Sequence, residues 1–187
     1  MNNKDTKMIV EAGISIALSV ILSFIVIFRM PLGGSVTIAS RLPIVIYAVR
    51  RGWEKGIIAA GVLGVVQMLV GGYMVHPIQV LLDYLLSYGA MGLAGISFGD
   101  KANKFSYVPS IILSYIVSGA FNVISGMIYF YDMATAQKAG FHSFLTYALA
   151  YNYSFLAADA LILLVVFILS YNSLRVLFEK QDSKAKF

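Results

Sequence analysis

The sequence predicts an all-α integral membrane protein, a six-helix transmembrane bundle with both termini in the cytoplasm. Hydrophobic residues make up 59% of its 187 residues and charged residues only 12%, whereas soluble domains carry roughly 25% charged residues. Long apolar segments recur along the chain, and most reach the ~20 residues that a membrane-spanning helix needs. Because no soluble domain or internal repeat interrupts them, residues 1–187 are expected to form a single transmembrane domain.

The helices are expected where the apolar segments lie. The first, fourth, fifth and sixth segments are long enough to cross a bilayer completely. The second and third are shorter and are separated by the charged turn "VRRGWEKG", so we interpret them as two helices, one of them short or irregular. The expected helices cover about residues 7–29, 36–49, 54–71, 77–98, 106–131 and 143–176.

Basic residues are distributed unevenly around these segments, and this predicts the orientation of the chain. With six helices, only Arg29, Arg41 and Lys138 of the 14 Lys and Arg residues fall on the outer side. Because Lys and Arg are enriched in cytoplasmic segments, both termini are expected in the cytoplasm. The bases do not form one patch, so the net charge of +5 indicates orientation in a bilayer and no nucleic-acid partner.

Several kinds of catalytic chemistry are not expected. The chain has no Cys and two His, which excludes disulfides and thiolate metal sites and makes a His-based metal site unexpected. Neither GxxxxGK[ST] nor HExxH occurs, and His142 and Ser143 are adjacent loop residues without a third partner. We therefore expect no enzyme activity, no metal and no cofactor, and any ATP hydrolysis must come from another chain.

Two carboxylates, Asp83 and Asp159, lie deep in apolar segments. A charge at the bilayer centre costs ~2.5–3.5 kcal/mol on insertion scales, so it normally faces a partner or a wet cavity. Asp83 lies about two turns from the outer end of the fourth helix at Pro77. That depth suits a pocket open to the outside, and the alternatives are an ion pair with Arg41 or a hydrogen bond to a neighbouring helix. Asp159 could hold a helix contact, a proton or a ligand, and its context favours the helix contact.

The fifth and sixth helices carry polar and aromatic side chains that could face a pocket. Tyr147 and Tyr151 are four residues apart and share a face of the sixth helix, with Asn152 one position further. Asn122 precedes the aromatic run Tyr129–Tyr131 on the fifth helix. Taken alone, that run is more typical of an interfacial aromatic belt than of a pocket wall.

The first helix contains small residues that allow close packing. Gly13 and Ala17 lie four positions apart, a spacing that lets another helix approach closely. The contact could lie inside the bundle or could dock the chain onto a separate membrane subunit.

Four stretches of sequence resemble one transporter family over nearly the whole chain. They are "PLGGSVTIASRLPIVIYAVRRGWEKG", "VGGYMVHPIQVLLDYLLSYGAMGLAG", "NVISGMIYF" and "YALAYN", and they are similar to the thiamine-specific substrate-binding subunits (S components) of energy-coupling factor (ECF) vitamin transporters. The resemblance implies high-affinity binding of a vitamin under a lid of outer loops, in the bacterial plasma membrane. It also implies assembly with a membrane scaffold subunit and two cytosolic ATPases.

The resemblance implies site residues as well. Gly13 and Ala17 match the family's docking ridge. A carboxylate can pair with an aminopyrimidine edge or a thiazolium, and aromatic faces attract a delocalised cation. The matched ligand positions are Asp83, Tyr84, Tyr73, Phe130, Tyr129, Tyr147 and Asn152.

The chain departs from the family pattern at further candidate positions. Asn122 stands where members carry His, Ser118 where they carry a base, and Asp159 has no expected counterpart; the family's pocket tryptophans are absent. The ligand is therefore expected to be thiamine or a thiamine-like molecule, such as a hydroxymethyl-pyrimidine or a vitamin B6 form, with a weakened preference for phosphorylated thiamine. The residues also allow a stand-alone, proton-coupled secondary transporter that uses Asp83 and Asp159, although no inverted repeat is visible.

Overall fold

The computed structural model of the chain describes residues 3–30, 34–100 and 103–183, and it is mostly helical. Within these residues, five helices are long and apolar enough to cross a membrane. This agrees with the expected all-α membrane protein. The elements are α1 (Asn3–Ser23), β1 (Val26–Arg29), β2 (Ser35–Thr37), α2 (Leu42–Arg51), α3 (Trp53–Gly71), α4 (Pro77–Val80), η1 (Leu81–Leu86), α5 (Ser87–Gly89), η2 (Ala90–Gly95), η3 (Lys104–Tyr107), α6 (Val108–Tyr129), α7 (Met133–Lys138) and α8 (Phe144–Ser183).

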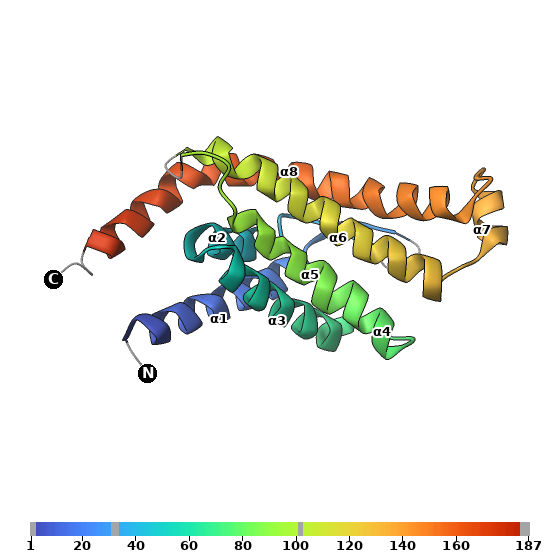
Figure 1. The fold of residues 1–187 in the computed structure, drawn as a ribbon, viewed down its shortest axis with the longest axis horizontal. Coiled ribbons are helices and arrows are strands. Elements are labelled where there is room, and N and C mark those ends of the chain that lie inside the picture. Colours follow the sequence, from blue (N-terminus) through green and yellow to red (C-terminus); the bar gives the residue numbers. More distant parts are fainter. Residues whose placement is uncertain (1–2, 31–33, 101–102, 184–187) are drawn as a thin grey trace.

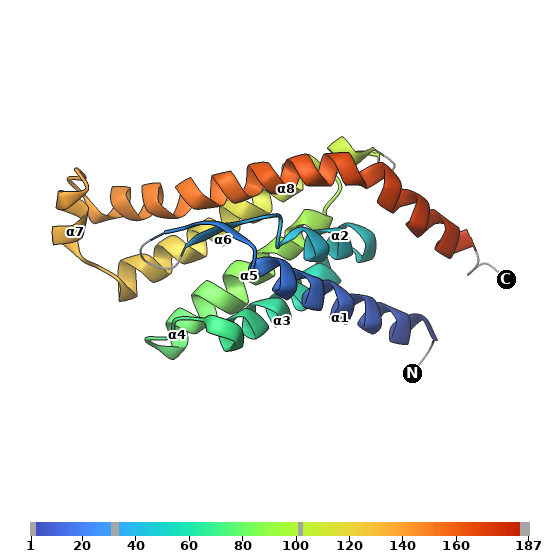
Figure 2. The ribbon, with the colours of Figure 1, turned by 180° about the vertical axis from the view of Figure 1, so that it is seen from behind.

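The long helices form an elongated bundle. α6 and α8 run side by side, and the continuous α4–η1–α5–η2 rod packs against α6 (Figure 1). α3 packs against this rod, α1 packs against α3, and the short α2 contacts α1, α3 and η2. Both chain termini lie toward one end of the bundle, and α4 and α7 lie at the opposite end in both views (Figure 2). At the end that carries the termini, Glu11 on α1 forms ion pairs with Arg50 and Arg51 of α2.

The segment between α1 and α2 differs from the expected helices. The first helix ends at Ser23 rather than at 29, and the second begins at Leu42 rather than at 36. The chain instead forms an antiparallel hairpin in which Val26 pairs with Thr37 and Arg29 with Ser35. β-branched residues favour strands, and "PLGG" between the strands disfavours a helix. The expectation of helix over 24–29 and 36–41 was therefore wrong.

α2 is much shorter than a membrane span. Its 10 residues correspond to ~15 Å of helix, whereas the hydrocarbon core is ~30 Å thick. Pro43 lies in its first turn, where the missing N–H has no helical partner to lose. Ile44, Val45 and Ala48 are fully buried, so α2 packs as an internal helix of the bundle.

Glycines allow α3 to lie directly against the rod. A Cβ at Gly64 would overlap the carbonyl oxygen of Tyr84, and a Cβ at Gly92 would overlap the backbone of Ile57. The two backbones therefore approach more closely than side chains would permit. This contact fixes the height and rotation of the part of the rod that carries Asp83.

Candidate functional site

The rod changes helical type at the residues expected to bind a ligand. α4 begins at Pro77, and its first turn is capped by His76, whose Nδ1 accepts a hydrogen bond from the Ile78 N–H at 3.2 Å. The next turn, η1, is π-helical and contains both Asp83 and Tyr84. π-helical turns are rare in proteins, and those that occur are often found at functional sites.

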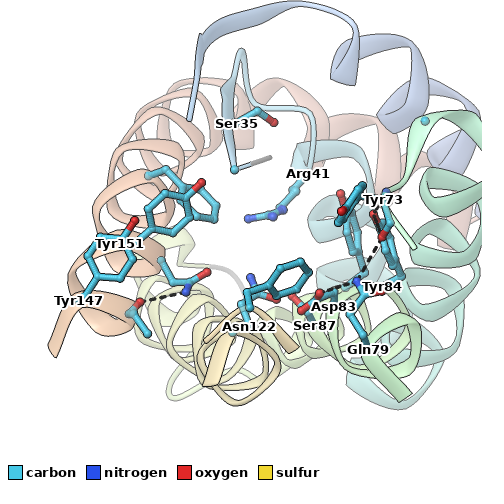
Figure 3. A pocket seen from close by; sticks show the side chains of 18 of the residues that line it. Ser35, Arg41, Tyr73, Gln79, Asp83, Tyr84, Ser87, Asn122, Tyr147 and Tyr151 are labelled. Carbon is cyan, nitrogen blue, oxygen red and sulfur yellow. Dashed lines mark hydrogen bonds between the residues drawn. The ribbon is translucent and has the colours of Figure 1, made fainter. Parts of the chain in front are cut away.

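Next to this turn lies a cavity of about 260 Å³. Its walls come from β2, the connection between α3 and α4, the rod, α6 and the first half of α8. In Figure 3, Tyr147 and Tyr151 lie on one side, Tyr73, Asp83 and Tyr84 lie on the other, and Arg41 extends into the space between them. The lining includes these predicted residues: Tyr73, Asp83, Tyr84, Asn122, Phe130, Tyr147 and Asn152.

Hydrogen bonds hold the acidic side of the cavity. Asp83 Oδ2 accepts a bond of 2.7 Å from Gln79 Nε2. The Tyr84 hydroxyl accepts a bond of 2.8 Å from the Tyr73 N–H, which ties the connection between α3 and α4 to the rod. The ring of Tyr73 in turn lies 6.1 Å from that of Phe130, at the C-terminal end of α6.

Aromatic rings line the α8 side. The Tyr147 and Tyr151 ring centroids are 6.0 Å apart, and Tyr151 meets Phe155 edge-on at 6.1 Å. The Asn152 side-chain N–H donates to the Ala148 carbonyl at 2.9 Å, so the amide is anchored to its own helix. The site can therefore stack a planar ligand on one side and offer a carboxylate on the other.

Arg41 is a lining residue that was not predicted as part of the site. Its guanidinium lies 5.4 Å from the ring centres of both Tyr88 and Tyr115. It pairs with Asp159 at 3.4 Å, so the alternative of an ion pair between Arg41 and Asp83 is wrong. Arg41 thus places a basic side chain on the cavity wall, and the Asp159 carboxylate partly neutralises it.

Asp159 does not line this cavity. It borders a second cavity of about 360 Å³ beside the hairpin, and it is 2% exposed. Its carboxylate accepts from the Thr37 N–H at 3.2 Å, the Thr37 hydroxyl at 3.0 Å and the Tyr115 hydroxyl at 2.7 Å. The contacts of Asp159 thus hold the hairpin against α6 and α8. This is the structural role, a contact between elements, that its sequence context favoured.

Two other predicted residues, Ser118 and Tyr129, are not among the residues that line the cavity. Ser118 is buried and shares a hydrogen bond of 2.8 Å with Ser87, which does line the cavity. Tyr129 stacks on His76, with 5.1 Å between ring centres. Gln79 was missed, although its position four residues before Asp83 places both on one helix face.

The small residues of α1 face outward. Gly13 and Ala17 are both exposed, and a Cβ at Gly13 would contact nothing within 4 Å. Ala12 and Ile16, on the other face, pack against the core. The interpretation of this ridge as packing inside the bundle is therefore wrong.

The chain was compared with known proteins. The family model described as "Thiamine transporter protein (Thia_YuaJ)" matches residues 9–179. The thiamine transporter ThiT of Bacillus subtilis is 28% identical over 178 residues, covering 88% of this chain and 90% of the relative. The solved structure of ThiT from Listeria monocytogenes superposes with a TM-score of 0.66 at 19% identity, over 97% of this chain and 98% of that one. The chain therefore belongs to the thiamine transporter protein family.

Proposed function

We propose that the chain is the substrate-binding subunit of an ECF-type vitamin transporter in the bacterial plasma membrane, and that it binds thiamine in the cavity beside Asp83. The observation that supports this most strongly is the position of Asp83. Its carboxylate borders a cavity that is also lined by the aromatic rings of Tyr73, Phe130, Tyr147 and Tyr151. A cationic ligand with two aromatic rings suits both features.

The cavity has the size and chemistry for such a ligand. Its volume of about 260 Å³ lies just below the ~300–1,000 Å³ usual for ligand pockets, which suits a small molecule. The aromatic faces of Tyr147 and Tyr151 attract a delocalised cation such as a thiazolium. Pairing with a ligand cation or amine also offsets the cost of placing Asp83 within the membrane.

Related ligands belong to the same proposal. A hydroxymethyl-pyrimidine or a vitamin B6 form would also use the carboxylate and the rings, but with fewer contacts. Arg41 adds a cation to the cavity, and Asp159 already neutralises part of its charge. We therefore expect a phosphate group on thiamine to add little affinity.

The proposed partners are a membrane scaffold subunit and two cytosolic ATPases. The exposed ridge of Gly13 and Ala17 on α1 provides a surface that another membrane helix can approach closely. The chain has no phosphate-binding loop, so the energy must come from other subunits. In this proposal the transmembrane bundle has six helices, of which α2 is one, and both termini lie in the cytoplasm.

The test is a calorimetric titration of the detergent-purified chain with thiamine, its phosphates, pyridoxine and hydroxymethyl-pyrimidine. Asp83→Asn is expected to weaken thiamine binding by about 1–3 kcal/mol, the value of a hydrogen bond to a charged group. The matched control is Asp132→Asn. Asp132 is the exposed N-cap of α7, and hydrogen bonds from Thr135 lower the pKa of its carboxyl, so the control removes an ionised carboxylate of the same kind. Equal affinity of wild type and Asp83→Asn would contradict the site.

A stand-alone proton-coupled transporter remains testable in the same preparation. It requires two carboxylates that exchange protons during transport, whereas Asp159 accepts hydrogen bonds from Thr37 and Tyr115 and pairs with Arg41. Vesicles that contain this chain alone are expected to show no thiamine uptake under a pH gradient. Uptake under those conditions would favour this alternative over the ECF subunit.

A further inference from the structure

Gln79 is a buried polar residue at the point where three parts of the site meet. Its side chain is on α4, it is 2% exposed, and it lines the cavity. Its amide N–H groups donate to Asp83 Oδ2 at 2.7 Å and to the Tyr73 carbonyl at 3.2 Å, and its Oε1 accepts from the Val75 N–H at 3.2 Å. In Figure 3 this amide lies beside Asp83, on the same side of the cavity as Tyr73 and Tyr84.

These partners determine the orientation of the amide. The Val75 N–H can only donate, so it requires Oε1 on its side. The two acceptors, Asp83 Oδ2 and the Tyr73 carbonyl, then require the two N–H groups of Nε2. Every polar group of the Gln79 side chain is used, and a fully satisfied network of this kind is rigid.

The shortest of the three bonds goes to the carboxylate, as expected when the acceptor is charged. It holds one oxygen of Asp83 and prevents the carboxylate from turning freely about its side-chain bond. The connection between α3 and α4 has a separate attachment, because the Tyr73 N–H also donates to the Tyr84 hydroxyl at 2.8 Å. Loss of Gln79 therefore removes its bond to the Asp83 carboxylate, whereas the connection keeps its attachment through Tyr84.

We propose that Gln79 is a positioning residue of the binding site. It sets the plane of the Asp83 carboxylate so that the carboxylate accepts a hydrogen bond from an amine on the ligand's pyrimidine ring. Gln79 thereby gives the site its preference for an amine over a carbonyl at that ring position. The inference rests on the proposed function, since it takes thiamine as the ligand and Asp83 as its partner.

The test compares thiamine with oxythiamine, which carries a carbonyl oxygen in place of the exocyclic amine and keeps the thiazolium. The measured quantity is the dissociation constant of oxythiamine divided by that of thiamine, both obtained by calorimetry on the purified chain. Gln79→Met keeps the length of the side chain and removes its hydrogen bonds. The ratio is expected to fall about threefold to tenfold, the effect of one hydrogen bond.

Gln67→Met is the matched control. Gln67 is on α3, accepts a hydrogen bond from Ser23 at 3.3 Å, and lines the second cavity but not the cavity beside Asp83. Its substitution is expected to leave the ratio unchanged. A variant that weakens thiamine and oxythiamine by the same factor has lost only structural support, so this result for Gln79→Met would overturn the inference.

A second variant decides the matter if Gln79→Met does not fold. Gln79→Glu keeps the size of the side chain and an oxygen for the Val75 N–H, but when ionised it cannot donate to Asp83. Its added charge acts on the thiazolium of both ligands and cancels in the ratio, which is again expected to fall. An unchanged ratio overturns the inference while leaving the proposed function intact, whereas failure of the wild-type chain to bind thiamine overturns the proposed function itself.

Discussion

Asp83 and Asp159 are both membrane-embedded carboxylates, but their surroundings differ. Asp159 accepts hydrogen bonds from Thr37 and Tyr115 and pairs with Arg41. The protein itself therefore supplies both the hydrogen bonds and the opposite charge that this carboxylate needs. Asp83 accepts a bond from Gln79 at the edge of a cavity. A buried carboxylate needs partners. At Asp159 the protein supplies them, and we propose that at Asp83 the ligand completes the set.

This difference predicts how each residue affects stability. Asp159→Ala leaves the Arg41 side chain, which is 12% exposed, without its carboxylate, and breaking a buried pair in this way costs about 3 kcal/mol or more. We expect a lower free energy of unfolding, measured by denaturant titration in detergent micelles. The double variant Arg41→Met/Asp159→Leu should recover part of the loss, because no unpaired charge remains. Unchanged stability of Asp159→Ala would show that the network does not hold the hairpin.

At the scale of elements, local patterns predicted the long helices better than their ends. The segments that became α1, the rod, α6 and α8 were recognised because each contains an apolar run of sufficient length, whereas α3 was predicted from a shorter run. The hairpin was missed because "VIFR" and "SVT" are as apolar as the helices beside them, and a two-stranded pairing depends on residues of both strands. The π-helical turn at Leu81–Leu86 was also invisible, since its sequence continues the helical pattern of the rod.

The contact between α3 and the rod yields a prediction about that turn. Gly64→Ala places a methyl group against the Tyr84 carbonyl, and overpacking of this kind typically costs 1–3 kcal/mol. Because the rod must shift, thiamine binding should weaken together with stability. Gly89→Ala is the control in the same rod, since its Cβ would come no closer than 3.8 Å to another residue. Calorimetry and thermal unfolding of both variants would test this, and equal behaviour of the two would contradict it.

At the scale of the whole molecule, the site depends on neighbours that are far apart in the sequence. Asp83 and Tyr147 could be proposed from their own segments and from the family resemblance. The pairing of Arg41 with Asp159, 118 residues away, could not, because one sequence does not show which helices are adjacent. For the same reason the second cavity had no signal in the sequence. The sequence therefore predicted which polar and aromatic side chains each helix carries, but it did not predict which helices contact one another.

The separation of the cavity from the outer face of α1 predicts that binding and transport can be uncoupled. Ala17→Leu enlarges the exposed ridge without touching the cavity, so thiamine binding to the purified chain should stay unchanged. Thiamine uptake by cells or vesicles that contain the whole proposed transporter should fall at least about tenfold, because a bulky side chain prevents close approach of another helix. Ala157→Leu, an equally exposed change on α8, should leave both measurements unchanged. If Ala17→Leu transports normally, α1 is not the docking helix, and the partner must contact another face of the bundle.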